Sequence, residues 1–125
     1  MRLMVVDDEI DVQYLFEQRF RKEIKSGEIK IEYAFNGRSA LNLIETIEDL
    51  SEFLILTDIN MPEMTGIELL KEIKLRFPQL RVIVITAYGD ENNVTMAKNL
   101  GADDYFTKPL EFSVLKARIN SYNTL

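Results

Sequence analysis

The chain has 125 residues, 46% of them hydrophobic, which is the usual size of one domain with a single buried core. It contains no Cys and no His, so disulfides, thiol catalysis, Ser-His triads and zinc sites of thiolate or imidazole are excluded. The net charge of −6 argues against direct nucleic-acid binding, because a surface that binds phosphates must be basic.

The first half of the chain alternates short apolar runs with stretches of helical periodicity. Leu3–Val6 predicts a buried strand, and apolar residues at helical spacing predict a helix from Glu9 to about Lys25. A second strand is expected at Ile29–Phe35, and a second helix at about Ala40–Ile47. A third apolar strand follows at Phe53–Leu56.

The second half repeats the alternation. A third helix is expected around residues 69–73 and is ended by Pro78. The run Val82–Ile85 is the most β-branched in the chain and predicts the fourth strand. The remaining elements are expected to be a helix at about Asp90–Leu100, a short strand at Tyr105–Phe106 and a last helix from Glu111 to about Tyr122.

The predicted strands are mostly continuous apolar runs rather than alternating ones. Such strands are buried on both faces, as in a parallel sheet with helices on each side. The sequence therefore predicts a single doubly wound α/β domain. The apolar run Met1–Val6 is too short for a signal peptide or a membrane span, so we expect a cytoplasmic protein without membrane contact.

Polar residues close four of the predicted strands. Asp7 and Asp8 follow the first strand, Asp58 the third, Thr86 the fourth and Lys108 the fifth. Open sheets of this kind bind ligands outside the carboxyl ends of their strands. We therefore expect three carboxylates, a hydroxyl and an ammonium group to meet at one edge of the sheet.

Three neighbouring carboxylates repel one another and raise each other's pKa unless a cation lies among them. With oxygen ligands alone that cation is expected to be hard, and Mg²⁺ is the natural candidate. We expect Asp8 and Asp58 to be direct ligands and Asp7 to hold water molecules in the outer shell. Taken without Asp58, the pair Asp7-Asp8 fits a solvated turn better than a functional site.

A carboxylate can act as a nucleophile and form an acyl phosphate, which gives Asp58 a chemical role. Phosphoryl transfer requires positioning and neutralisation of charge on the three equatorial oxygens. Mg²⁺, Lys108, and Thr86 with backbone amides would each take one oxygen. The ordinary alternatives are an exposed loop lysine and a strand-end threonine. Pro109 restricts the backbone next to Lys108, and a cis bond there would aim the lysine inward.

Four motifs resemble the receiver domains of bacterial response regulators, the CheY-like domains of two-component systems. In chain order they are Val5-Val6-Asp7-Asp8-Glu9, Thr57-Asp58-Ile59-Asn60-Met61-Pro62 followed by Gly66, Ile85-Thr86-Ala87, and Gly101-Ala102-Asp103-Asp104-Tyr105-Phe106-Thr107-Lys108-Pro109-Leu110. The resemblance spans essentially the whole chain. It implies a flavodoxin-like (βα)5 fold with strand order 2-1-3-4-5. It also implies one receiver domain over residues 1–125, with no output domain in this chain.

The resemblance implies that a partner histidine kinase or a phosphotransfer protein phosphorylates Asp58. The chain would then be a signalling switch that catalyses only its own phosphorylation and dephosphorylation, not a turnover enzyme. The backbone carbonyl of Asn60 is implied as a further ligand of Mg²⁺, for which Mn²⁺ could substitute. Thr86, Ala87 and Lys108 would contact the phosphoryl group.

Further roles follow from the same resemblance. Tyr105 matches an aromatic residue that turns inward as Thr86 moves toward the phosphate, and Asn60 and Tyr88 match positions that tune the lifetime of the phosphate. The output face would be about residues 90–122, acting on a downstream protein or a fused output domain. A phosphorylation-dependent homodimer is a further expectation. A stand-alone regulator and a receiver within a longer protein both fit the sequence.

Two features depart from the commoner family pattern without an evident function, namely Thr57 and the pair Met64-Thr65. Three other readings remain open. A phosphohydrolase of the haloacid dehalogenase type needs a second Asp two residues after the nucleophile, where this chain has Asn60. A flavodoxin-like flavin carrier needs a phosphate-binding loop where the acidic run Asp7-Asp8-Glu9 stands. A receiver without phosphorylation would not need the complete acidic set.

Overall fold

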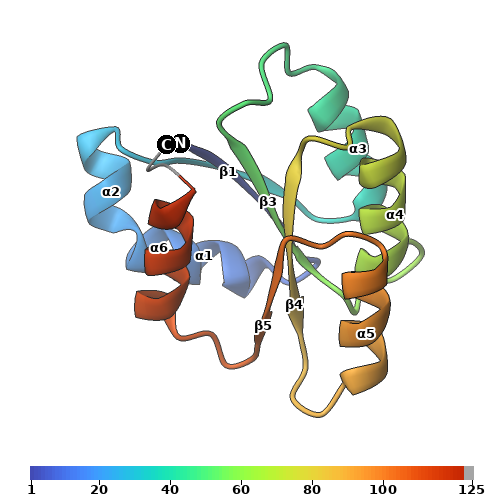
Figure 1. Cartoon of the computed structure of the whole chain (residues 1–125). Coiled ribbons are helices and arrows are strands. Elements are labelled where there is room, and N and C mark those ends of the chain that lie inside the picture. Colours follow the sequence, from blue (N-terminus) through green and yellow to red (C-terminus); the bar gives the residue numbers. More distant parts are fainter. Residues whose placement is uncertain (123–125) are drawn as a thin grey trace.

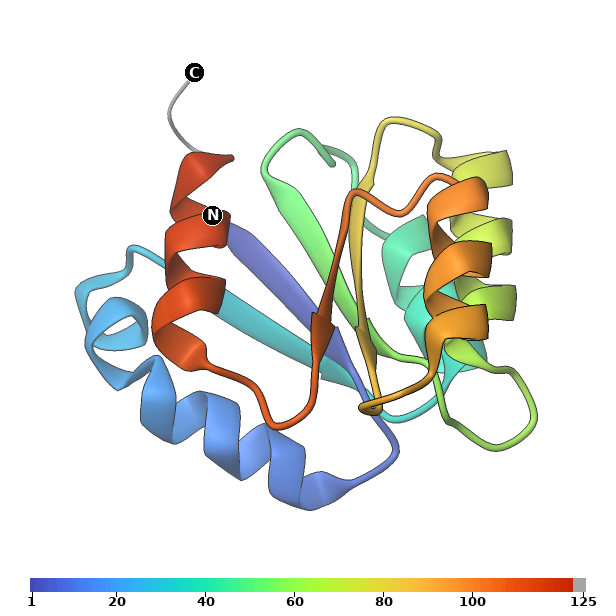
Figure 2. The same ribbon diagram turned by 60° about the horizontal axis from the view of Figure 1, so that its bottom comes forward.

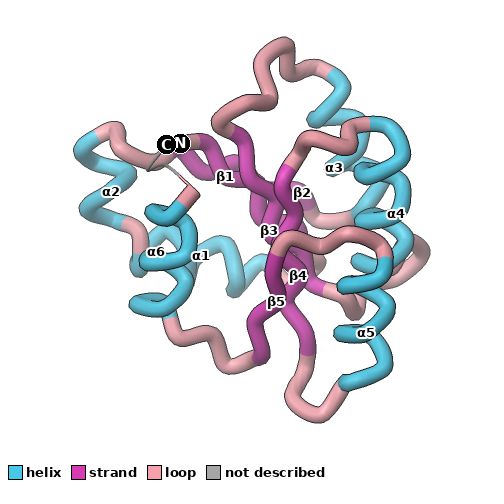
Figure 3. The backbone as a smooth tube through the Cα atoms, viewed as in Figure 1, coloured by secondary structure: helices cyan, strands magenta, loops and turns pink. Residues whose placement is uncertain are grey.

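In the computed structural model, which describes residues 1–122, a central sheet lies between two layers of helices (Figure 1). Within these residues the sheet has five strands, all parallel, in the order β2-β1-β3-β4-β5 (Figure 3). The strands are β1 (Arg2–Val6), β2 (Lys30–Ala34), β3 (Phe53–Asp58), β4 (Arg81–Thr86) and β5 (Asp104–Thr107). The predicted doubly wound α/β fold and its strand order are confirmed.

Six helices cover the sheet within the described part of the chain. They are α1 (Ile10–Arg19), α2 (Arg21–Ser26), α3 (Gly37–Glu45), α4 (Gly66–Arg76), α5 (Glu91–Asn99) and α6 (Phe112–Ser121). Helices α1, α2 and α6 lie on one face of the sheet, and α3, α4 and α5 lie on the other (Figure 1, Figure 2). Among residues 1–122, no helix combines the length and apolar character that crossing a bilayer requires.

The alternation of side chains along each strand divides the core into two clusters. Leu3 and Val5 of β1 pack with residues of α1 and α6, whereas Met4 and Val6 pack with residues of α3 and α4. Strand β3 is buried along its whole length, and β4 along all but its first residue. This two-sided burial explains why these strands are continuous apolar runs. It also makes a buried polar residue at a strand end unusual enough to need an explanation.

The helix predicted from Glu9 to about Lys25 is wrong in one respect, because the structure has two helices there. The break falls at Phe20, whose backbone has φ −102° and ψ 16°. Phe20 is fully buried, and its ring lies 5.7 Å from the ring of Phe16 and 6.1 Å from that of Phe112 in α6. We attribute the break to this packing, which overrides the helical preference of the local sequence.

Two helices near the carboxyl edge of the sheet begin with strong local caps. The Glu68 backbone N–H donates to Thr65 Oγ1 at 3.2 Å, and the Thr65 N–H donates to Glu68 Oε1 at 3.1 Å. This capping box starts α4. The side chain of Asn36 accepts the N–H of Ser39 at 2.8 Å and starts α3 in the same way. Thr65, unexplained from the sequence, therefore has a structural role.

Candidate functional site

The carboxyl ends of the strands lie together at one edge of the sheet, where the loops after β1, β3, β4 and β5 meet (Figure 2). Strands β1 and β3 are neighbours here, and β4 lies on the other side of β3. The Lys108 N–H donates to the Thr86 carbonyl at 2.9 Å and so places the end of β5 beside the end of β4. The polar strand ends that the sequence singled out thus share one edge.

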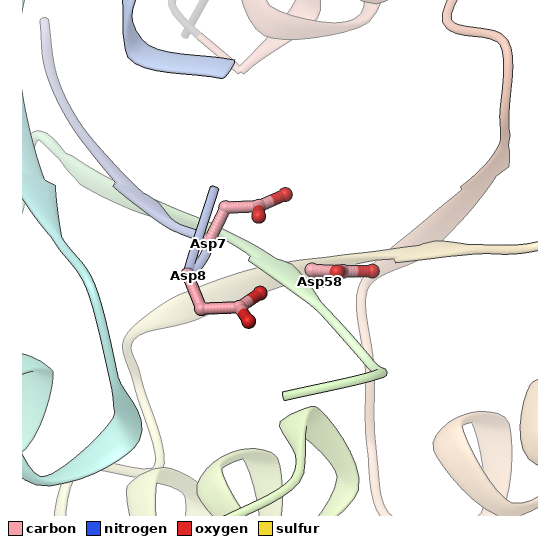
Figure 4. A group of neighbouring side chains, drawn as sticks. All are labelled: Asp7, Asp8 and Asp58. Atoms are coloured by element: carbon pink, nitrogen blue, oxygen red, sulfur yellow. The ribbon is translucent and has the colours of Figure 1, made fainter. Parts of the chain in front are cut away.

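Three carboxylates form a cluster at this edge. Asp7 and Asp8 follow β1 directly, and Asp58 is the last residue of β3. In Figure 4 the side chains of Asp7 and Asp8 extend toward Asp58, and oxygen atoms of the three carboxylates all lie within 4.8 Å of one another. Asp7 and Asp58 are buried, whereas Asp8 is exposed and opens the cluster to solvent. The predicted convergence of the three acids is confirmed.

The electrostatics of the cluster favour a bound cation. Burial raises the pKa of Asp58, and the ammonium of Lys108 opposes that rise. Burial also raises the pKa of Asp7, and the charge of Asp58 adds to the rise. A donor set made of oxygen alone fits Mg²⁺, and the exposed Asp8 leaves room for the water molecules that Mg²⁺ retains. The residues present therefore fit a hard divalent ion.

Lys108 brings a positive charge to the cluster. Its Nζ lies 3.4 Å from Asp58 Oδ2 and 3.8 Å from Asp7 Oδ2. The peptide bond between Lys108 and Pro109 is cis, and the lysine side chain reaches the acids, as anticipated from the sequence. Because 40% of the Lys108 side chain is exposed, it has room to follow a group that arrives at Asp58.

Thr86 lies at the end of β4, next to β3, and is almost completely buried. Its hydroxyl donates to the carbonyl of Ala87 at 3.3 Å, which is a long hydrogen bond. Ala87 itself is exposed. The structure thus places Thr86 beside the acids, with its hydroxyl bonded to the neighbouring backbone.

The two tyrosines that the sequence singled out do not join the acids. Tyr88 is 91% exposed in the loop after β4. Tyr105 in β5 is 38% exposed, and Lys98 Nζ lies 4.7 Å from the centre of its ring. A hollow of about 580 Å³ lies between the end of β4, α5 and β5, and Thr86 and Tyr105 both line it. It provides space between the strand end and the tyrosine.

Asn60 lies two residues after Asp58 and is exposed, while its neighbours Ile59 and Met61 are buried. The N–H groups of Ile59 and Asn60 face the Asp58 carboxylate and lower its pKa, against the effect of burial. The Asn60 N–H therefore lies close to the Asp58 carboxylate.

Two residues that shape the Asp58 backbone received no role from the sequence. The buried hydroxyl of Thr57 donates to the Asp58 carbonyl at 3.0 Å. A side chain at Gly66 would overlap the same carbonyl, and the Gly66 N–H donates to the Ile59 carbonyl at 2.8 Å. The sequence analysis noted Thr57 as a departure from the family pattern and Gly66 as part of the motif that follows Asp58. The close contact that explains each depends on the folded loop.

Comparison with known proteins adds an independent finding. A family model described as "Response regulator receiver domain" matches residues 3–120. Sporulation initiation phosphotransferase F of Bacillus subtilis is 33% identical over 121 residues, which cover 97% of this chain and 92% of that protein. Regulatory protein AtoC of Escherichia coli is 35% identical over 114 residues. That match covers 91% of this chain but 23% of AtoC, so the chain spans about a quarter of this longer relative.

Solved structures show the same likeness. A response regulator receiver domain protein from Clostridium thermocellum superimposes with a TM-score of 0.84 at 26% identity, covering 97% of this chain and 92% of that one. The receiver domain of NtrX from Brucella abortus gives a TM-score of 0.81 at 28% identity, with coverage of 98% and 99%.

Proposed function

The chain belongs to the family of response regulator receiver domains, and from this premise we propose that Asp58 accepts a phosphoryl group in the presence of Mg²⁺. The observation that carries the proposal is the buried Asp58 carboxylate, with Lys108 Nζ at 3.4 Å and the oxygens of Asp7 and Asp8 within 4.8 Å. The donor is a histidine kinase or a phosphotransfer protein. Residues 1–125 contain no His, so the donor phosphohistidine lies outside them.

The transfer is a nucleophilic displacement at phosphorus. An Asp58 carboxylate oxygen forms the new P–O bond while the P–N bond of the donor phosphohistidine breaks, and its electron pair leaves with the imidazole nitrogen. The product is an acyl phosphate on Asp58. The nucleophile must be ionised, and Lys108 supports ionisation because its charge lowers the pKa that burial raises.

We assign the metal ligands as the carboxylates of Asp8 and Asp58 and the backbone carbonyl of Asn60, with Asp7 holding water molecules in the outer shell. Mg²⁺, when bound, supplies charge neutralisation for the transferring oxygens, and Mn²⁺ is expected to substitute. The buried position of Asp7 and Asp58 supports this assignment, since two buried like charges need a counter-charge.

Residues at or just after the ends of β4 and β5 bind the remaining phosphoryl oxygens. Lys108 exchanges its ion pair with Asp58 for one with the phosphoryl group, which its exposed side chain permits. The Thr86 hydroxyl exchanges its long bond to the Ala87 carbonyl for a phosphoryl oxygen, and the Ala87 N–H donates beside it. These contacts exist only in the phosphorylated state, and such differential contacts are what shift a two-state equilibrium.

The signal leaves through the face formed by about residues 90–122. As Thr86 turns toward the phosphoryl group, Tyr105 moves into the hollow that both residues line. This movement alters the face seen by a downstream protein or a fused output domain, or by a second copy in a phosphorylation-dependent homodimer. Asn60 and the exposed Tyr88 tune how fast the acyl phosphate is hydrolysed. We propose one receiver domain over residues 1–125.

Receiver domains are signalling switches rather than turnover enzymes. Asn60 supports this reading, because an amide cannot serve as the general acid that a phosphohydrolase would need two residues after its nucleophile. The self-catalysed phosphorylation and dephosphorylation belong to the proposal.

Incubation of the purified protein with acetyl phosphate and Mg²⁺ tests the proposal. We expect the wild type to gain the mass of one phosphoryl group, and Asp58→Asn to gain none because the nucleophile is missing. Asp49→Asn serves as the matched control, since Asp49 is an exposed aspartate outside the cluster. Labelling that persists in Asp58→Asn, or that is equal after chelation of the metal, would overturn the mechanism.

A further inference from the structure

Gly37, the first residue of α3, lies directly against Met64 in the loop between β3 and α4. A Cβ atom at Gly37 would lie 2.5 Å from Met64 Sδ, 2.8 Å from its Cγ and 3.1 Å from its Cβ. The contact runs along the methionine side chain, so a movement of the thioether end alone would not make room. Gly37 is not among the glycines with positive φ. The position therefore requires the absence of a side chain rather than an unusual backbone.

The contact joins the loops that follow the two strands on either side of β1. Strand β1 lies between β2 and β3 in the sheet. Gly37 comes soon after β2 and Met64 soon after β3, so their contact passes over the end of β1, where Asp7 and Asp8 begin. The Asp7 N–H donates to the Ala34 carbonyl of β2 at 3.1 Å, which shows how near the start of this bridge lies to the acids.

The loop that carries Asn60 is anchored at both ends, by the bond from the Ile59 N–H to the Ile85 carbonyl and by the capping box at Thr65. Its two ends are joined by the hydrogen bond from the Gly66 N–H to the Ile59 carbonyl. Met61 is buried near the start, and Met64 packs against the same core cluster. Glu63, between them, holds a positive φ of 65°, which few residues other than glycine adopt. Met64 therefore adds a packing contact to the second half of the loop, just before the capping box at Thr65.

Resting on the function proposed above, we propose that Gly37 and Met64 are positioning residues for the phosphorylation of Asp58. The Met64 side chain packs directly against the backbone of Gly37. This contact fixes the position of the 59–65 loop relative to the end of β1. It thereby holds the Asn60 carbonyl in the position that a metal ion shared with Asp8 and Asp58 requires. Neither Gly37 nor Met64 touches the reacting atoms.

The variants Gly37→Ala, Met64→Ala and the double variant test this role, because two effects of Gly37→Ala have opposite signs. Alanine is favoured over glycine in a helix, so Gly37→Ala would stabilise α3 if the Met64 contact had no role. We expect instead that it weakens Mg²⁺ binding about tenfold, the lower end of the range for residues that orient metal ligands. Labelling by acetyl phosphate should slow in parallel.

In the Met64→Ala background, Gly37→Ala should change Mg²⁺ affinity by less than about twofold, because the atoms that it would meet are gone. Affinity is measured by NMR titration with Mg²⁺. The amide shifts of Asn60 and Met61 in the metal-free protein provide a second readout, which should move in Gly37→Ala and return toward those of Met64→Ala in the double variant. Ser39→Ala, in the same turn of α3, is the matched control.

Unchanged Mg²⁺ affinity in Gly37→Ala would overturn the inference, even if the midpoint of thermal unfolding fell, since that pattern describes a purely structural contact. A double variant that binds Mg²⁺ more than about twofold less tightly than Met64→Ala would overturn it as well. If the wild type neither bound Mg²⁺ nor gained a phosphoryl group, the proposed function would fail instead. The metal-free amide shifts would then still report whether Gly37 and Met64 are coupled.

Discussion

At the scale of single residues, opposing effects act on the pKa of Asp58. Burial raises its pKa, while Lys108 and two backbone N–H groups lower it. Its carbonyl is fixed separately, by the Thr57 hydroxyl and by close packing against Gly66. The carboxylate can therefore be reactive while the backbone that presents it stays in place. In the proposed mechanism the acids bind the metal ion and Lys108 binds the phosphoryl group, so single substitutions should separate the two roles.

Asp8→Ala should lower Mg²⁺ affinity by at least about tenfold, because it removes a ligand that the exposed mouth of the cluster presents to the ion. Lys108→Ala should leave Mg²⁺ affinity largely intact but impair the conformational response to phosphorylation, since Lys108 is assigned to the phosphoryl group. An NMR titration measures affinity, and the amide shifts after acetyl phosphate treatment measure the response. Equal loss of metal in both variants would contradict the assigned roles. Lys30→Ala is the control, because Lys30 is exposed at the start of β2, at the end of the sheet opposite the acids.

Thr57→Val should lower the free energy of unfolding by about 1 kcal/mol, because the Asp58 carbonyl loses a hydrogen bond inside the protein. It should also slow labelling by acetyl phosphate. Thr57→Ser keeps the hydroxyl and loses a buried methyl group, so it should be less stable than wild type but keep the labelling rate. Urea unfolding measures the free energy of unfolding, and the time course of labelling by acetyl phosphate measures the labelling rate. A labelling rate that falls in Thr57→Ser and not in Thr57→Val would contradict this account.

At the scale of the elements, the second half of the predicted first helix is a separate piece. α2 follows the break at Phe20 and is tied to α6 by an ion pair between Glu23 Oε2 and Lys116 Nζ at 2.9 Å. Lys116 Nζ also lies 5.1 Å from the centre of the Phe20 ring. This ion pair thus joins α2 to α6 across the same face of the sheet.

The ion pair predicts a pH dependence of stability. The hydrogen bond from Lys116 holds the pKa of Glu23 below its usual value. A carboxyl with a lowered folded-state pKa adds stability that is fully present above its unfolded-state pKa and is lost as the pH falls through the folded-state value. Glu23→Gln should therefore flatten the fall in unfolding free energy below about pH 5, by 1 kcal/mol or less.

Urea unfolding at a series of pH values measures this effect. Glu28→Gln is the control, because Glu28 is an exposed glutamate without an ion pair in the described part of the chain. The same slope in wild type and Glu23→Gln would show that the pair adds no stability.

At the scale of the whole molecule, the sheet order creates the site. Its members come from four strand ends that parallel pairing places side by side. The sequence predicted this assembly because continuous apolar strands ending in Asp, Thr or Lys can be recognised without coordinates. The fold class, the strand order implied by the resemblance, and the meeting of Asp7, Asp8 and Asp58 are confirmed.

What the sequence could not predict depends on contacts between distant elements. The break at Phe20 follows from its packing on Phe112, nearly a hundred residues later. The contact between Met64 and Gly37 joins the segments that follow β3 and β2, which are not neighbours in the sheet. In the local sequence Phe20 looks like the interior of a helix, and Met64 looks like an ordinary loop residue. Periodicity and motif spacing describe neighbours along the chain, so such long-range contacts lie beyond them.

The ion pair between Lys108 and Asp58 also bears on synthesis. Asp7 and Asp8 leave the ribosome about a hundred residues before Lys108. A nascent or truncated chain therefore carries the acids without the ammonium group that balances them. Since β5, which precedes Lys108, follows the other strands of the sheet along the chain, this ion pair can form only after all of them have been synthesised.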